Sequence, residues 1–435
     1  MLRKPLPTRG SARSPIGSKF ALALALGCGT VLATAAIAVP AQAQRQRDQK
    51  PAAAQTLSRN FQPVYQQVAD ATNTTGDYAA AKAQVPALLA AIGSEYDRFF
   101  AGNILLQLGS KASDKALQKQ GIELMVASGQ TDPANLGLLR YFLSAFAYDA
   151  GDYAGALREA EASLAAGFAG DFAQQQDPWL LVADAHFKLG QNAQGLAFLK
   201  NTIEQRVAAG QPIQEQWINR AIAMAYQQNM MQETGQFSAL LVKTNPTPAN
   251  WTKALQVVSA LVQSDEQARL DVLRLMDLTG SLSQRGEFES YIDVLDPRVL
   301  PAEAGRVLQA GVQKGVFTTG DPFYSEVKRI IDTRAAAEAG LAADYAGDAG
   351  GASNGRPAFN AGDVYLSLGQ YAKAEEMFAL ALQKGGIDRD QTLTRLGIAQ
   401  VRQGKNAEAK STFAQVSGTR AAVAGLWSAY ADSRA

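Results

Sequence analysis

The chain has 435 residues, and its 41 basic residues nearly balance its 40 acidic ones. That balance argues against a nucleic-acid-binding surface, which requires an excess of Lys and Arg. With one histidine and one cysteine, the sequence also excludes a disulfide framework and a zinc site built on His and Cys.

The N-terminal segment has the three parts of a secretory signal. Residues 1–19 carry five basic residues and no acidic residue, residues 20–39 form an apolar run, and Ala41-Gln42-Ala43 supplies an A-x-A cleavage site. We therefore expect a signal peptide at residues 1–43 and a periplasmic location. An uncleaved membrane anchor is the alternative, because about 20 apolar residues are long enough to span a bilayer.

The mature chain begins with a polar segment and continues with a helical pattern. Residues 44–58 are polar and low in complexity, so we expect a disordered tether. In residues 59–334 apolar side chains recur at spacings of three and four, which predicts an N-terminal array of helices. No later apolar run is long enough for an integral membrane segment.

Parts of this array repeat at a fixed distance. Gly151-Asp152-Tyr153 followed by Ala156 forms one unit of the pattern, and Trp251 follows Trp217 by 34 residues. A period of that length is typical of stacked helical hairpins. Residues 335–355 interrupt the pattern with a segment rich in Ala and Gly, so we expect a linker there, although its first half is compatible with a continued helix.

The clearest repeat lies near the C-terminus, in residues 361–418. Four of its residues return after 35 positions: Gly362 as Gly397, Gly369 as Gly404, Ala374 as Ala409, and Phe378 as Phe413. We expect a pair of hairpins at residues 356–435, with a last helix at about residues 420–430 that caps the stack.

These positions resemble the tetratricopeptide repeat, which places small and aromatic residues along two helices at the slots of Gly362, Gly369, Tyr371, Ala374, Phe378 and Ala381. The resemblance implies an all-α solenoid, a superhelix of stacked hairpins whose concave face binds a protein or peptide. Residues 246–320 are in addition similar to tetratricopeptide proteins found with TonB-type systems of the bacterial cell envelope. Together with the secretory signal and the lack of catalytic and cofactor-binding motifs, this resemblance leads us to expect a non-enzymatic periplasmic adaptor, without a cofactor, that acts in envelope assembly or transport.

Four polar residues of the C-terminal pair occupy the groove-facing slots of this pattern: Arg356, Asn360, Arg395 and Arg402. In some tetratricopeptide domains Lys, Arg and Asn at these slots clamp a peptide carboxylate, which a guanidinium binds with two hydrogen bonds. We expect these four residues to bind the partner. The alternative is that they are solvated surface residues.

Two positions are candidates for catalysis. His186 lies at a slot that usually holds an aromatic residue, which favours packing over chemistry. Glu289-Ser290 matches two letters of the soluble lytic transglycosylases, where a glutamate with a raised pKa acts as general acid. The further motifs of that family are missing, so we expect no enzyme; a cell-wall-acting enzyme and a purely structural spacer are the alternatives.

Overall fold

The computed structural model describes residues 56–434, and in that part of the chain it contains 21 α-helices and no strand. This is the all-α solenoid that the sequence predicts. The expected signal peptide at residues 1–43 and most of the expected tether lie outside the described residues. Within them, no helix combines the length and the apolar character needed to cross a membrane.

The chain divides into two compact units, Met1–Gln191 and Asn192–Ala435. The helices of the first unit are α1 (Phe61–Asp70), α2 (Tyr78–Ala83), α3 (Val85–Ala90), α4 (Glu95–Lys111), α5 (Lys115–Ala127), α6 (Pro133–Asp149), α7 (Tyr153–Ala165) and α8 (Pro178–Lys188). The hairpins α4–α5 and α6–α7 are its most closely packed pairs. A Cβ added to Gly102 of α4 would lie 2.5 Å from the carbonyl oxygen of Gly121 in α5, so only glycine fits where these backbones meet.

Left-handed residues and aspartate caps set the helix boundaries. Gly151 has φ +80° after α6, and the side chain of Asp152 then accepts a hydrogen bond from the backbone N–H of Gly155 at the start of α7. The turn between the helix that ends at Gln227 and the helix that begins at Met231 has no glycine, and Asn229 adopts the left-handed conformation there with φ +54°. Asparagine tolerates this conformation better than most residues do, so the hairpin forms without the glycine.

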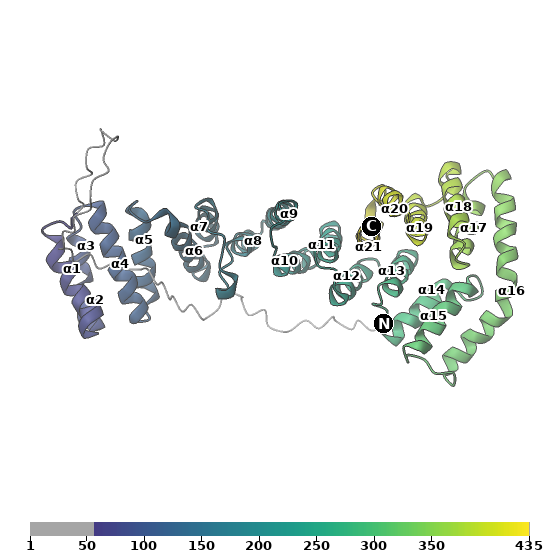
Figure 1. Ribbon diagram of the computed structural model, residues 1–435, viewed down its shortest axis with the longest axis horizontal. Coiled ribbons are helices and arrows are strands. Elements are labelled where there is room, and N and C mark those ends of the chain that lie inside the picture. The colour runs from purple at the N-terminus through teal and green to yellow at the C-terminus, as the bar shows by residue number, and fades with distance from the viewer. Residues whose placement is uncertain (1–55, 435) are drawn as a thin grey trace, which may run out of the picture. The chain divides into compact units, whose positions relative to one another are not determined.

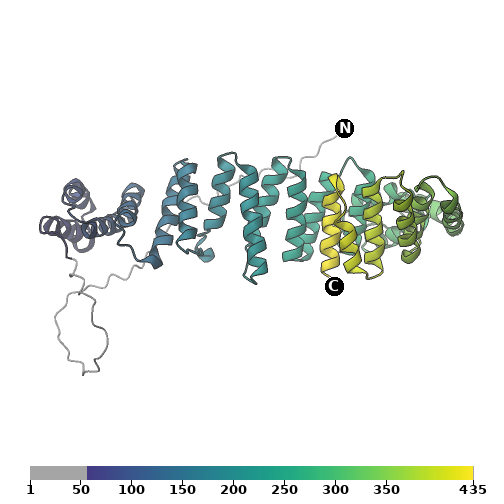
Figure 2. The same cartoon turned by 90° about the horizontal axis from the view of Figure 1, so that it is seen from above.

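The helices of the second unit are α9 (Asn192–Ala208), α10 (Glu215–Gln227), α11 (Met231–Thr244), α12 (Pro248–Leu261), α13 (Glu266–Leu278), α14 (Arg285–Leu295), α15 (Pro301–Gln313), α16 (Pro322–Gly351), α17 (Arg356–Ser367), α18 (Tyr371–Lys384), α19 (Arg389–Arg402), α20 (Asn406–Phe413) and α21 (Ala421–Asp432). Figure 1 shows how the chain curves after α12 until its last helices, drawn in yellow, return to the teal ones. Helix α21 packs against α11, and α13 contacts both α19 and α21. Figure 2 shows the helices of this unit side by side from above. We call α11–α21 the closed ring.

The expected linker is part of this ring. Residues 335–351 form the second half of α16, a helix of 30 residues that packs against α17. Ala342 and Ala349 are fully buried, and the Glu338 side chain is buried as well. Alanine-rich composition suits a flexible linker and a closely packed helix equally, and here the small side chains serve close packing. The boundary between the two compact units lies instead after Gln191.

The last helix forms near the expected residues but is placed inside the ring. Trp427 is fully buried, its ring stacks on Phe413 with centroids 6.4 Å apart, and its Nε1 donates a hydrogen bond to the Asp271 carbonyl oxygen at 2.9 Å. Every residue of α21 is at least partly buried. A cap on an open stack has a polar, exposed outer face, whereas α21 lies between α11 and α13 and closes the ring.

Candidate partner-binding groove

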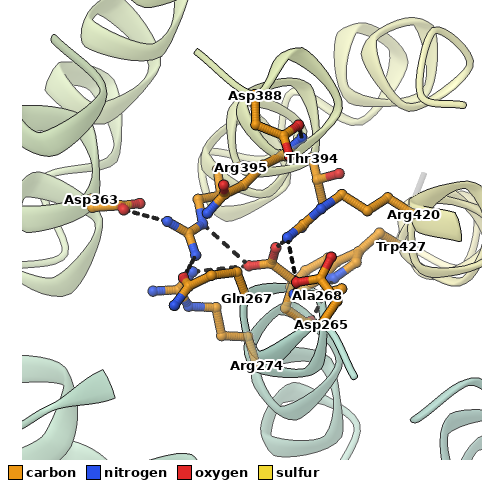
Figure 3. Close-up of polar contacts among 12 residues, drawn as sticks. Asp265, Gln267, Ala268, Arg274, Asp363, Asp388, Thr394, Arg395, Arg420 and Trp427 are labelled. Carbon is orange, nitrogen blue, oxygen red and sulfur yellow. Dashed lines mark hydrogen bonds and ion pairs between the residues drawn. The ribbon is translucent and has the colours of Figure 1, made fainter. Parts of the chain in front are cut away.

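Charged residues of the closed ring pair with one another where α19 meets α13 and α17. Arg395 of α19 is 1% exposed, and its guanidinium donates hydrogen bonds to Asp363 of α17 and to Gln267 of α13. Its Nε lies 3.6 Å from a carboxylate oxygen of Asp271. Figure 3 shows Arg395 lying between Asp363 and Gln267.

A second arginine joins the C-terminal segment to the same helix. Arg420 donates from Nη1 to Asp271 and from Nη2 to Asp265, each at 3.1 Å. Together with the bond from Trp427, these contacts hold α19 and α21 against α13. We call this set the α13 latch. It consists of Asp265 at the N-cap of α13, Gln267 and Asp271 within α13, and Arg395, Arg420 and Trp427 opposite them.

A buried ion pair ties α13 to α15 on its other side. Arg274 donates from Nε and Nη2 to the two carboxylate oxygens of Glu303, both at 2.8 Å, and from Nη1 to Asp271 at 3.0 Å. Tyr291 donates a further bond to Glu303 at 2.9 Å. Burial by itself would raise the pKa of Glu303, but Arg274 outweighs it and holds that pKa below its usual value. Glu303 is therefore ionised at neutral pH.

The four residues predicted to bind a partner lie in different surroundings. Arg356 is exposed at the start of α17, and Asn360 is half-buried in the same helix. Arg402 is exposed, with its guanidinium over the Tyr371 ring at 4.6 Å from the centroid. Arg395 does bind carboxylates, but they are those of this chain, because the ring brings α13 against α19. Partner binding by these four residues stays a prediction.

A groove of about 1480 Å³ lies elsewhere in the second unit, between α9, α11 and α21. Its volume exceeds the roughly 300–1,000 Å³ of typical small-molecule pockets. The residues that line it come from two distant parts of the chain, 200–261 and 416–432. The groove therefore exists only because α21 returns to α11.

Small residues bring α11 and α21 together along this groove. A Cβ added to Gly235 of α11 would lie 2.5 Å from the Cβ of Ala422, a distance that atoms do not tolerate. A Cβ added to Gly425 of α21 would instead meet the Cβ of Ala239 at 3.6 Å, an ordinary contact. The helices are thus in closest contact at Gly235.

The groove combines apolar side chains with charges at its rim. Val207 and Met231 are large apolar residues with 46% and 42% of their surface exposed. Lys200 pairs with Glu204 on α9, and Lys243 of α11 pairs with Asp432 of α21, each at 3.4 Å. Exposed apolar side chains beside charged ones are typical of surfaces that bind other proteins.

A second lysine, Lys410 of α20, also pairs with Asp432. Burial by itself would raise the pKa of Asp432, but the hydrogen bond from Lys410 and the attraction of Lys243 outweigh it and lower that pKa. Two ammonium groups therefore share one ionised carboxylate at this end of the groove.

The residues considered for catalysis have ordinary contacts. Glu289 accepts a hydrogen bond from Arg285 Nε at 2.7 Å, one helical turn away. Nδ1 of His186 lies 2.7 Å from the side-chain oxygen of Gln191. Among the described residues no group of three or more His, Cys, Asp or Glu side chains is arranged to hold a metal ion.

Comparison with known proteins agrees with the C-terminal pattern. The family described as tetratricopeptide repeat matches residues 356–383, which span α17 and most of α18. The chain contains a tetratricopeptide repeat. Its match to the family lies in the hairpin that supplies Asp363 to the closed ring.

One solved structure similar to this chain is entitled "Structure of Naa15/Naa10 bound to HypK-THB", with 15% identity and a TM-score of 0.36. The similarity covers 82% of this chain and 64% of that chain, so this chain spans less than two thirds of its length. No curated protein matches the sequence.

Sequence reasoning did not find the latch or the groove. Arg420 and Asp271 are 149 residues apart, and no repeat spacing relates them. Asp265, Gln267 and Asp271 resemble the exposed polar residues of any amphipathic helix. The small residues of α21 were a weak signal, since they suit close packing but do not name the helix against which they pack.

Proposed function

We propose that this protein is a non-catalytic scaffold that binds a protein partner in the groove between α9, α11 and α21. The groove is the observation that carries the proposal, because it extends beyond the size of typical small-molecule pockets and exposes Val207 and Met231. The tetratricopeptide repeat supports the same reading, since stacked helical hairpins present extended binding surfaces.

The proposed place of action is the bacterial periplasm, in the assembly or transport functions of the cell envelope. The basic, apolar and A-x-A parts of residues 1–43 support export. The proposed envelope role rests on the resemblance that the sequence of residues 246–320 bears to envelope tetratricopeptide proteins. N-terminal sequencing of the protein from a periplasmic fraction would test this part, with Gln44 as the expected first residue; an intact Met1 in the cytoplasm would contradict it.

Site-specific photo-crosslinking in the producing cells tests the binding site. A photo-reactive amino acid replaces Gln236, which is exposed and lines the groove on α11. The control replaces Gln383, an exposed glutamine of α18 that does not line it. We expect a discrete crosslinked product from position 236 and none of that size from position 383. No product from 236, or the same product from both, would reject the groove as the binding site.

A further inference from the structure

We propose that the groove receives one amphipathic α-helix of the partner, which lies along α11 between α9 and α21 with an acidic residue beside Lys243. This inference rests on the proposed function, because it specifies the kind of segment that the scaffold binds. It also makes binding depend on closure of the ring, because the latch holds the groove's two parts together.

The dimensions of the groove fit a helix. Its floor is α11, whose 14 residues extend for about 21 Å. Residues along the whole of α11 line the groove, from Met231 to Thr244, and so do residues along the whole of α21, from Ala421 to Asp432. A partner helix of about three to four turns would cover this length.

The walls also favour a helix over an extended peptide. Helices α9, α11 and α21, together with the connecting residues 211–213 and 416–419, line the groove. None of these residues belongs to a strand, so the groove offers no strand edge to which an extended backbone could add. Ala421, Gly425 and Ser428 line the groove at positions i, i+4 and i+7 of α21, which places three small side chains on one face. Small residues let a neighbouring helix approach closely, as α11 already does where Gly235 meets Ala422.

The apolar groups of the groove match one face of such a helix. Val207 on α9, together with Met231 and Leu240 on α11, lines the groove. Aliphatic side chains of the partner, repeated at spacings of three and four, would cover these residues and remove them from water.

Charge complementarity specifies the end of the groove at which the acidic residue lies. Lys243 and Lys410 both pair with Asp432, which leaves one positive charge in excess there. On α9 Lys200 and Glu204 neutralise each other. A carboxylate of the partner beside Lys243, whose side chain is 60% exposed, would balance the excess charge.

The test uses the purified full chain and two displayed peptide libraries of equal composition. One library has 16-residue amphipathic helices with an acidic residue near one end, and the other has the same peptides with two central prolines, which prevent a helix. We expect binders from the helical library alone. Binders from the proline library alone, or from neither, would overturn the proposal.

Two pairs of variants then place the selected peptide. Gln236→Trp fills the groove and should weaken binding by about tenfold or more, whereas the matched surface variant Gln383→Trp should leave it unchanged. Lys243→Glu should weaken binding of the same peptide. A second peptide, in which Lys replaces the acidic residue, should bind the Lys243→Glu variant about as well as the first peptide binds the wild type. Equal binding to the two Trp variants, or no recovery by the exchanged peptide, would reject the site or the orientation.

The dependence on closure is measured with Arg420→Gln, which removes two ion pairs of the latch; Arg420 does not line the groove. We expect this variant to bind the peptide more weakly than the wild type does. If closure of the ring favours peptide binding, then peptide binding must favour closure to the same extent. The urea midpoint of the wild type, followed by Trp fluorescence, should therefore be higher in the presence of peptide. An unchanged wild-type midpoint at saturating peptide would overturn the coupling, whether or not Arg420→Gln folds.

The peptide libraries test the helical partner, and the crosslinking experiment tests the binding site, so either proposal can be rejected without the other. If position 236 gives a crosslinked product but the helical library gives no binder, the scaffold function stands and the helical partner does not. If position 236 gives no product, the proposed binding site itself is rejected.

Discussion

Buried arginines in the closed ring are each matched by carboxylates of the same chain. Arg274 binds Glu303 and Asp271, Arg395 binds Asp363, and Arg420 binds Asp271 and Asp265. A buried ion pair adds little net stability when both partners are present, but removing one partner leaves an uncompensated charge. The arrangement therefore specifies which helices meet more than it strengthens their contact.

Glu303→Ala tests this at the Arg274 pair. We expect the free energy of unfolding of the second unit to fall by about 3–5 kcal/mol, because Arg274 keeps its charge but loses two hydrogen bonds. Urea titrations followed by Trp fluorescence would measure it. The double variant Arg274→Met with Glu303→Leu should recover much of the loss; a double variant as unstable as Glu303→Ala would contradict the explanation.

Glu338→Gln tests a carboxyl group without an arginine partner. Burial raises the pKa of Glu338 above the usual 4.5, although hydrogen bonds from Ser367 and the Ala302 N–H lower it. The folded state thus binds this proton more tightly than the unfolded state, and the contribution of Glu338 to stability falls as pH rises through its raised pKa. The glutamine variant lacks this loss.

Relative to the wild type, the Glu338→Gln variant should therefore gain stability as the pH rises from the ordinary glutamate pKa of 4.5 through the raised pKa of Glu338. Glu303 has a lowered pKa, so its contribution to stability is lost in acid, the opposite pH dependence. Glu303 is present in both the wild type and the variant and therefore cancels from the comparison. Urea titrations at several pH values would give the difference between them, and a difference that is flat or falls with pH would refute the assignment.

At the scale of elements, the contact between α11 and α21 depends on one glycine more than on another. Both Gly235 and Gly425 lie in helix interiors, where Ala is intrinsically favoured by roughly 0.5–1 kcal/mol. The two glycines differ in the room that is available for a Cβ atom. At Gly235 a Cβ would clash with Ala422, whereas at Gly425 it would make an ordinary van der Waals contact.

Gly235→Ala should destabilise the ring by about 1–3 kcal/mol, because α21 must move away from α11. Gly425→Ala should be neutral or stabilising by up to about 1 kcal/mol. The Trp fluorescence midpoint in urea compares the two variants. A smaller effect of Gly235→Ala than of Gly425→Ala would show that the helices do not meet as described.

Individual hairpins were predictable because their signals are local. Gly369 and Gly404 both have positive φ, as turn glycines of the repeat require. Gly362 and Gly397 lie against Phe378 and Phe413, so the 35-residue period reports a real packing contact. The helix at residues 335–351 was harder to predict, because burial of Ala342 and Ala349 depends on α17 and not on local composition.

At the scale of the whole molecule, the class of fold was predictable but the closure was not. Stacked hairpins need contacts only between neighbours, whereas the ring depends on Arg420, which lies 155 residues from Asp265. Arg395 was predicted to bind a carboxylate of a partner, and that prediction stays untested. The sequence pattern does not show that Asp363 and Asp271 supply carboxylates to Arg395 from within the chain.

Removal of residues 418–435 tests the role of closure. This truncation deletes Arg420 and Trp427, so α13 loses part of its cover, and its amide hydrogens should exchange faster with solvent. Exchange in α6 and α7 of the first unit should be unchanged and serves as the control. Hydrogen exchange measured by mass spectrometry would show the faster exchange in α13. Unaltered protection of α13 would argue against the latch.

The distance along the chain between Asp271 and Arg420 also bears on how the protein folds. An open solenoid can add hairpins one after another, because each needs only its neighbour. In this chain α13 is made some 149 residues before its partner, and contacts between such distant residues slow folding. The second unit therefore cannot complete its fold before α21 has left the ribosome, and α13 keeps a charged, incompletely covered surface until then.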